Sequence, residues 1–138
     1  MKFFTIGYGG RLPQEFLDQL QEYGVKIIAD VRLRPDRASM GCYTQAKTPD
    51  KGIEKILTER GIGYISLVEL GNVFRHEEEW PQLYQELFTH AGELLTRRIA
   101  GLPQPFCLMC SEKHVAECHR RIIADFLVQQ GHEVEHIE

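Results

Sequence analysis

The sequence predicts a Rossmann-like α/β sandwich of three layers, in which helices cover both faces of a mostly parallel five-stranded sheet. Three observations support this fold class. Short apolar runs alternate with longer amphipathic stretches, and such alternation of strands and helices is typical of parallel sheets. Glycines close several of the amphipathic stretches, as they close helices. The length of 138 residues, 43% of them hydrophobic, suits one domain over residues 1–138.

The first half of the chain predicts three strands separated by two helices. Apolar runs over residues 2–6, 26–31 and 64–67 predict the strands. Apolar residues at helical spacing predict one helix from Pro13 to Gly24 and another from Thr48 to Gly61. Proline suits the first position of a helix and glycine suits the residue after its last turn, which supports these boundaries.

The second half predicts two more helices and two more strands. The strongest apolar stripe of the chain extends from Trp80 to Ile99 and predicts a long helix. A fourth strand is predicted from Phe106 to Met109, and its wholly apolar composition indicates burial on both faces. A last helix is predicted from Val115 to Leu127, stopped at Gly131, and a short fifth strand follows over residues 134–137.

The polarity of the strands predicts their places in the sheet. Strands 1, 2 and 4 are almost purely apolar and suit the centre, whereas strands 3 and 5 contain polar residues and suit the edges. Right-handed crossovers then favour the order 3-2-1-4-5, with 2-1-3-4-5 as the alternative. In the favoured order the topological switch point lies between strands 1 and 4. Ligands of open α/β sheets bind there, beyond the carboxyl ends of the strands.

The segments that follow strands 1, 2 and 4 contain the candidate site residues. These segments are polar, and the predicted sheet brings them together although they are far apart in the sequence. The candidate ligand-binding residues are Gly7, Tyr8, Gly9, Asp30, Arg32, Arg34 and Arg120. The candidate catalytic residues are Cys110, Glu112 and His119, and no residue is assigned to a metal.

The glycine turn over residues 7–10 has two interpretations. It can let the backbone approach a phosphate, as in nucleotide-binding folds. It lacks the third glycine of a dinucleotide fingerprint, because Leu12 stands there, and it lacks the lysine of a P-loop. The alternative is a tight strand-to-helix turn that needs a positive φ.

Three arginines cluster after strand 2 in a chain whose net charge is −4. They are Arg32, Arg34 and Arg37. A guanidinium group suits a carboxylate or a phosphate, so we expect Arg32 to bind an anion, with Arg120 as the second cation. The alternative is that Asp30 pairs with an arginine and only holds the loop. The negative net charge excludes a polyanion-binding surface over the whole molecule.

Cys110 is the candidate nucleophile. It ends strand 4 before the expected helix, where a helix N-terminus and nearby arginines favour the thiolate, although Glu112 opposes it. His119 suits an acid or a base, or equally a solvated histidine. A Cys-x5-Arg phosphatase or rhodanese loop is excluded, because Ala116 stands at the arginine position, and a zinc deaminase is excluded by the order of its motifs. Cys118 falls on an apolar helical stripe and is expected to pack as a small hydrophobe.

Several motifs together resemble a known family. They are Thr5-Ile6-Gly7-Tyr8-Gly9, Asp30-Val31-Arg32, Leu70-Gly71, Cys110-x-Glu112-x5-Cys118-His119-Arg120 and His136-Ile137. Over nearly the whole chain the sequence is similar to domain-of-unknown-function family 488. The Cys-x-Glu…Cys-His-Arg signature is fairly specific, whereas the glycine turn alone is weak. The resemblance implies a compact α/β fold and the position of the site, and it implies no reaction, since the activity of the family is not established.

From these residues we expect a domain that binds a small anionic or phosphate-bearing ligand, nucleotide-like in character; whether it also acts on that ligand is left open. The alternatives are a nucleic-acid-associated domain that grips backbone phosphates through the Arg32–Arg37 loop, and a scaffold without a ligand. A steep salt dependence of nucleic-acid retention would favour the former alternative. We expect no cofactor, no tightly bound zinc, no membrane span, and a cytosolic location in which the four cysteines stay reduced.

Overall fold

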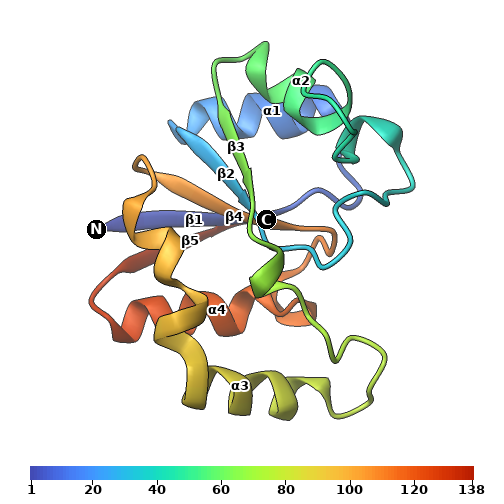
Figure 1. The fold of residues 1–138 in the computed structure, drawn as a ribbon. Coiled ribbons are helices and arrows are strands. Elements are labelled where there is room, and N and C mark those ends of the chain that lie inside the picture. Colours follow the sequence, from blue (N-terminus) through green and yellow to red (C-terminus); the bar gives the residue numbers. More distant parts are fainter.

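The fold class predicted from the sequence is confirmed. A computed structural model describes residues 1–138 and shows one five-stranded sheet, in which all neighbouring strands are parallel, together with four α-helices (Figure 1). The strands are β1 (Lys2–Gly7), β2 (Ile27–Asp30), β3 (Gly63–Ser66), β4 (Phe106–Cys110) and β5 (Glu133–Ile137). The helices are α1 (Pro13–Glu22), α2 (Gly52–Thr58), α3 (Trp80–Leu95) and α4 (Arg120–Gln129).

The order of the strands differs from the predicted one. It is β3-β2-β4-β1-β5, rather than 3-2-1-4-5 or 2-1-3-4-5. β4 lies at the centre, where Leu108 is flanked by Ala29 of β2 and Thr5 of β1. The prediction that strands 1, 2 and 4 are internal and strands 3 and 5 are edges is confirmed. The polarity of a strand indicates whether it lies inside the sheet or at an edge. It does not indicate which of the three internal strands lies between the other two.

The helices form one layer on each face of the sheet. α1 and α2 cover one face, and α3 and α4 cover the other (Figure 1). Successive side chains of β4 therefore enter different cores. Phe106, Leu108 and Cys110 pack in the core under α3 and α4, while Cys107 and Met109 pack in the core under α1 and α2. None of the helices has both the length and the apolar character that crossing a membrane requires.

The last helix begins later than predicted, and this affects the site. α4 begins at Arg120 rather than Val115, because Val115–Glu117 forms only a short 3-10 turn. The apolar stripe continues through both segments, so the helical spacing alone does not reveal the break. Residues 111–119 consequently form a loop, and its start is hydrogen-bonded to the turn that follows β1. Cys110 thus precedes a loop rather than the first turn of a helix.

Candidate functional site

A cavity of about 290 Å³ lies beyond the carboxyl ends of β1, β2 and β4. Its walls come from the turn after β1, the loop after β2, the segment between β3 and α3, and the loop after β4. Six of the predicted site residues line it, and they are Tyr8, Arg32, Arg34, Cys110, Glu112 and His119. The other four, Gly7, Gly9, Asp30 and Arg120, lie outside the lining of this cavity.

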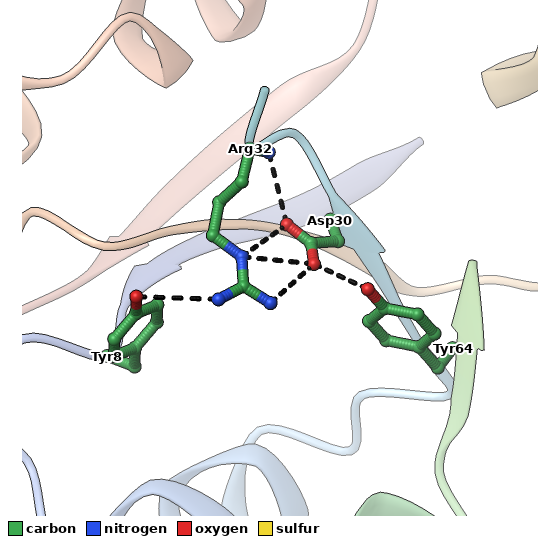
Figure 2. A network of polar contacts seen from close by, with 4 residues as sticks. All are labelled: Tyr8, Asp30, Arg32 and Tyr64. Carbon is green, nitrogen blue, oxygen red and sulfur yellow. Dashed lines mark hydrogen bonds and ion pairs between the residues drawn. The ribbon is translucent and has the colours of Figure 1, made fainter. Parts of the chain in front are cut away.

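Arg32 is held by a buried network that Figure 2 shows. Its Nη2 donates to Oδ2 of Asp30 at 2.7 Å, and its Nε donates to Oδ1 at 2.9 Å. Tyr64 donates its hydroxyl to the same carboxylate at 2.5 Å. The remaining nitrogen, Nη1, donates to the Tyr8 hydroxyl at 3.4 Å, and the guanidinium lies 5.2 Å from the Tyr8 ring centroid. Arg32 is therefore fixed in one orientation at the cavity wall, with most of its donors engaged.

The network also fixes the charges of its members. Burial opposes the charge of Arg32, but the hydrogen bonds and charge of Asp30 outweigh burial and raise the pKa of Arg32. Burial, followed by the Asp30 charge, raises the pKa of Tyr64, which keeps this phenol protonated as a donor. The pairing that the sequence left as an alternative is thus present, and it leaves Nη1 as the part of Arg32 nearest to the Tyr8 hydroxyl.

The other cavity arginines are more exposed and less engaged. Arg34 pairs on the surface with Asp36, with Nη2 and Oδ2 2.9 Å apart. Arg37 and Arg75 line the cavity, and neither forms an ion pair. Two acidic residues, Glu112 and Glu117, line the same cavity. The lining thus contains four guanidinium groups and two carboxylates, and two of the guanidinium groups are paired with aspartates.

Three lining residues between β3 and the first turn of α3 were not found from the sequence. They are Asn72, Arg75 and Trp80. Asn72 is 7% exposed, and its Oδ1 accepts a hydrogen bond from the backbone N–H of Phe74 at 3.0 Å. The candidate residues predicted from the sequence follow strands 1, 2 and 4 only, and Trp80 fits the apolar stripe that predicts the long helix. The same rule applied to strand 3 would have included this segment.

The glycine turn serves close backbone packing rather than a ligand in this cavity. A Cβ atom on Gly7 would clash with the Glu112 carbonyl oxygen, and one on Gly9 would lie 2.4 Å from the Ser111 carbonyl oxygen. The backbone N–H groups of Tyr8 and Gly9 donate to the carbonyls of Cys110 and Ser111 at 3.1 and 2.9 Å. Since these donors are engaged, they are not available to a phosphate. The glycines instead join the turn after β1 to the loop after β4.

Cys110 and Cys118 are bonded to each other through their sulfur atoms. Each residue is 1% exposed, and the Cys110 side chain lines the cavity. Cys118 was expected to be a packed hydrophobe, and it does belong to the core under α3 and α4. That assignment missed its partner, and the bond contradicts the expectation that all four cysteines are reduced. The pairing depends on how the loop over residues 111–119 folds back. Helical periodicity contains no information about that loop.

Arg120 has a different place from the predicted one. Its side chain is fully buried behind the cavity wall, where Nη1 donates to Sγ of Cys110 at 2.9 Å and to the Glu112 carbonyl at 2.7 Å. Nη2 donates to the Lys113 carbonyl at 3.2 Å, and Nε to Oγ1 of Thr5 at 3.3 Å. Arg120 was predicted to contact the ligand directly. Its burial and its four protein acceptors instead make it a support for the loop and for Cys110.

His119 is a buried histidine with defined partners. Its Nε2 lies 2.8 Å from the Val31 carbonyl, and because a carbonyl only accepts, Nε2 carries the proton. Burial lowers the pKa of His119, so the ring is neutral at pH 7. Its Nδ1 lies 3.7 Å from Sγ of Cys118, and its ring packs edge-on against Tyr84. The solvated alternative is therefore wrong, and Nδ1 is available as a proton acceptor.

The chemistry of the site does not suit a metal ion. The sulfurs of Cys110 and Cys118 and a Glu112 oxygen lie within 4.8 Å of one another. The two sulfurs are bonded together, however, and a metal binds the thiolate form. The guanidinium of Arg120 also contacts the Cys110 sulfur and would repel a cation there. The expectation of no tightly bound zinc stays a prediction.

The comparisons with known proteins identify the family. Residues 13–127 match the model of the family described as "Domain of unknown function DUF488", and the chain belongs to this family. The match covers α1 through most of α4, and so it includes the loops after β2 and β4 that line the cavity. No curated protein and no solved structure matches the chain.

Proposed function

We propose that the chain binds a small anionic ligand, phosphate-bearing and nucleotide-like, in the cavity beyond β1, β2 and β4. The observation that supports this most is the pair Arg37 and Arg75, two guanidinium groups that line one cavity without an acidic partner. A planar guanidinium donates two parallel hydrogen bonds to a phosphate or carboxylate. These two residues replace Arg120 as the expected cations beside Arg32.

The other lining residues favour a ligand that is more than a bare anion. Trp80 offers an aromatic ring, which suits stacking against a base. Glu112 and Glu117 offer acceptors for hydroxyl or amine donors, and they disfavour a simple polyanion. The volume of about 290 Å³ is near the lower limit of small-molecule sites, which suits a mononucleotide.

The test is a thermal-shift titration with adenosine, adenosine monophosphate, ribose 5-phosphate and sulfate. The phosphate-bearing compounds should raise the melting temperature in a dose-dependent way, and adenosine should not. Arg75→Ala should weaken binding about tenfold or more, because a charge-assisted hydrogen bond contributes roughly 1.5–3 kcal/mol. Arg121→Ala is the matched control, because Arg121 is partly exposed on α4 and lies outside the cavity lining. Arg121→Ala should bind like the wild type.

Two results would overturn this function. The first is that no anion stabilises the wild type, or that Arg75→Ala and Arg121→Ala respond alike. The second is tight retention of an oligonucleotide with a steep salt dependence, which would favour the nucleic-acid alternative through the Arg32–Arg37 loop. Nucleotide binding with a shallow salt dependence supports the small-ligand proposal.

A further inference from the structure

A buried positive charge without a carboxylate lies directly behind the cavity. The guanidinium of Arg120 is fully buried, and it takes part in no ion pair. Its acceptors are two backbone carbonyls, one hydroxyl and the sulfur of Cys110. Burial lowers the pKa of Arg120 to about 10, which leaves the group charged at neutral pH. A buried ion is costly unless an opposite charge compensates it.

The Cys110 sulfur is the one ionisable acceptor in contact with Arg120. The distance from Nη1 to Sγ is 2.9 Å, short for a hydrogen bond to sulfur. When the cysteine pair is reduced, a thiolate at Cys110 supplies the missing counter-charge, and a guanidinium beside a thiol favours that thiolate. Arg120 and Cys118 contact this sulfur, and a Glu112 oxygen lies within 4.8 Å of it. Tyr8, His119, and Arg32 with its partner Asp30 lie at the same cavity, and the charges of Cys107, Glu138 and Arg11 also act on Arg120.

The second sulfur has a proton acceptor beside it. Sγ of Cys118 is bonded to Sγ of Cys110, so the fold already brings the two together. Nδ1 of His119 lies 3.7 Å from Sγ of Cys118 and has no proton of its own. In the reduced protein the neutral imidazole can therefore accept the Cys118 proton as that sulfur attacks. The two cysteines have different neighbours and suit different roles.

We infer that Cys110 is a nucleophilic thiolate and Cys118 its resolving cysteine, and that together they reduce a small disulfide bearing negative charges. The negative charge of the substrate rests on the proposed function, because the arginines of the same cavity would select it. The cysteine roles rest on Arg120, His119 and the bond between the two sulfurs. An uncharged hydroperoxide would also oxidise a thiolate, but the cavity arginines would contribute nothing to its binding.

The reaction balances in two steps. The Cys110 thiolate attacks one sulfur of R–S–S–R, which forms a mixed disulfide Cys110–S–S–R and releases R–S⁻. The Cys118 thiol then loses its proton to Nδ1 of His119, and its sulfur attacks Sγ of Cys110. This step forms the Cys110–Cys118 bond and releases the second R–S⁻. The two cysteines lose two electrons, the substrate gains two, and the one proton passes from His119 to solvent.

The first experiment counts released thiols from the reduced, desalted protein. All variants carry Cys42→Ser, because Cys42 is partly exposed, whereas Cys107 is fully buried and its pKa is raised by burial. The reagent is 5,5′-dithiobis(2-nitrobenzoate), a dianionic disulfide with a coloured product. The parent should release two equivalents per chain and keep no adduct by mass. Cys118→Ser should release one equivalent and keep the adduct, and Cys110→Ser should lose the fast phase. The assignment of Cys110 as nucleophile and Cys118 as resolving cysteine is wrong if the parent keeps a stable adduct. It is also wrong if the Cys118→Ser variant releases two equivalents.

The second experiment tests the charge of the substrate. The rate with the dianionic reagent is compared with that of neutral 2,2′-dipyridyl disulfide, each divided by its rate with free cysteine. The parent should favour the dianion at least tenfold, and Arg75→Ala should reduce that ratio while two equivalents are still released. Equal normalised rates in the parent would overturn the anionic substrate and the proposed function, and would leave the cysteine roles intact. The two failures are thus distinguishable.

The third experiment tests Arg120 as a positioning residue. The rate of Cys110 alkylation by iodoacetamide is followed against pH in the Cys118→Ser background. It should reach half its maximum below about pH 8.5, the ordinary value for a free thiol. Arg120→Gln should move this midpoint upward, and Arg120→Lys should return it toward the parent, which a merely structural role would not do. If Arg120→Gln fails to fold, the test rests on the alkylation midpoint of the parent alone. A parent midpoint at or above about pH 8.5 would contradict the proposal that Cys110 is a thiolate.

Discussion

Asp30 determines which donors of the Arg32 guanidinium are free to bind a ligand. The sequence offered two roles for Arg32, an anion ligand or a partner for Asp30, and both need the same guanidinium. The carboxylate engages Nε and Nη2, while Tyr64 and the Arg32 backbone N–H saturate its own oxygens. Only Nη1 remains, and it points to Tyr8. Residue types alone could not decide this, because the choice depends on burial, which comes from the fold.

Removal of Asp30 should therefore destabilise the protein strongly. Asp30→Ala leaves Arg32 buried without its counter-charge, and breaking a buried pair in this way costs about 3–5 kcal/mol. The matched control is Asp36→Ala, which breaks the exposed Arg34–Asp36 pair and should leave stability nearly unchanged. Urea unfolding at pH 7 measures both. Equal losses for the two variants would contradict the importance of the buried network.

Single residues also show which parts of the candidate site could be predicted from the sequence. The candidate positions Tyr8, Arg32, Arg34, Cys110, Glu112 and His119 were predicted and line the cavity. Arg75 and Trp80 were missed, because nothing in the local pattern separates them from a surface charge and a helix-stripe residue. The role of Arg120 depends on its burial among carbonyls of a non-helical loop. No rule of spacing predicts the path of such a loop.

Two connecting elements act as one unit at the scale of secondary structure. The turn after β1 donates backbone hydrogen bonds to the carbonyls of Cys110 and Ser111, and Gly7 is the point of closest approach. The sequence predicted a special turn there but attributed it to a phosphate. The physical cause is that β1 and β4 are neighbours in the sheet, so their carboxyl ends meet. The favoured order 3-2-1-4-5 predicted that strands 1 and 4 are neighbours, whereas the alternative 2-1-3-4-5 placed strand 3 between them.

Gly7→Ala should disturb the loop that contains Cys110 and Glu112. An added Cβ would overlap the Glu112 carbonyl, a backbone atom that moves only with its loop. Overpacking of this kind costs typically about 1–3 kcal/mol, and we expect the upper end. Gly101→Ala is the control, because no atom lies within 4 Å of its added Cβ. Differential scanning calorimetry should show a lower melting temperature for Gly7→Ala only, together with weaker anion binding.

At the scale of the molecule, composition predicted the layers and the sheet interior better than it predicted the strand order. Apolar strands 1, 2 and 4 had to be covered on both faces, which fixed the three layers and the two edges. The strand order depends on which connections cross over β4. These connections decide which distant strands pair, and no periodic pattern in the sequence indicates such pairing. The predicted position of the cavity did not depend on the strand order, because the carboxyl ends of parallel strands meet at one edge in every order considered.

The whole molecule should lose stability as the pH falls from about 7 to 5. Burial lowers the pKa of His119, which is buried, and of His136, which is half-buried. The unfolded chain then binds more protons than the folded protein below about pH 6.5, so the free energy of unfolding decreases as the pH falls through this window. One such histidine gives a slope of at most about 1.4 kcal/mol per pH unit.

Acidic groups change the free energy of unfolding in a different pH range, so the contribution of the histidines can be measured separately. Contacts with Arg98 and Val115 lower the pKa of Glu69 and Glu138, so these carboxylates lose their contribution only at more acidic pH, below about 4.5. Urea titrations of the disulfide-bonded protein at pH 7, 6 and 5 therefore isolate the histidines, because a bonded Cys110 does not titrate. His119→Gln should flatten the dependence, because it removes the ring that resists protonation, while His90→Gln, an exposed control on α3, should keep the wild-type slope. An unchanged slope in His119→Gln would show that a neutral, buried His119 is not what makes the folded protein sensitive to acid.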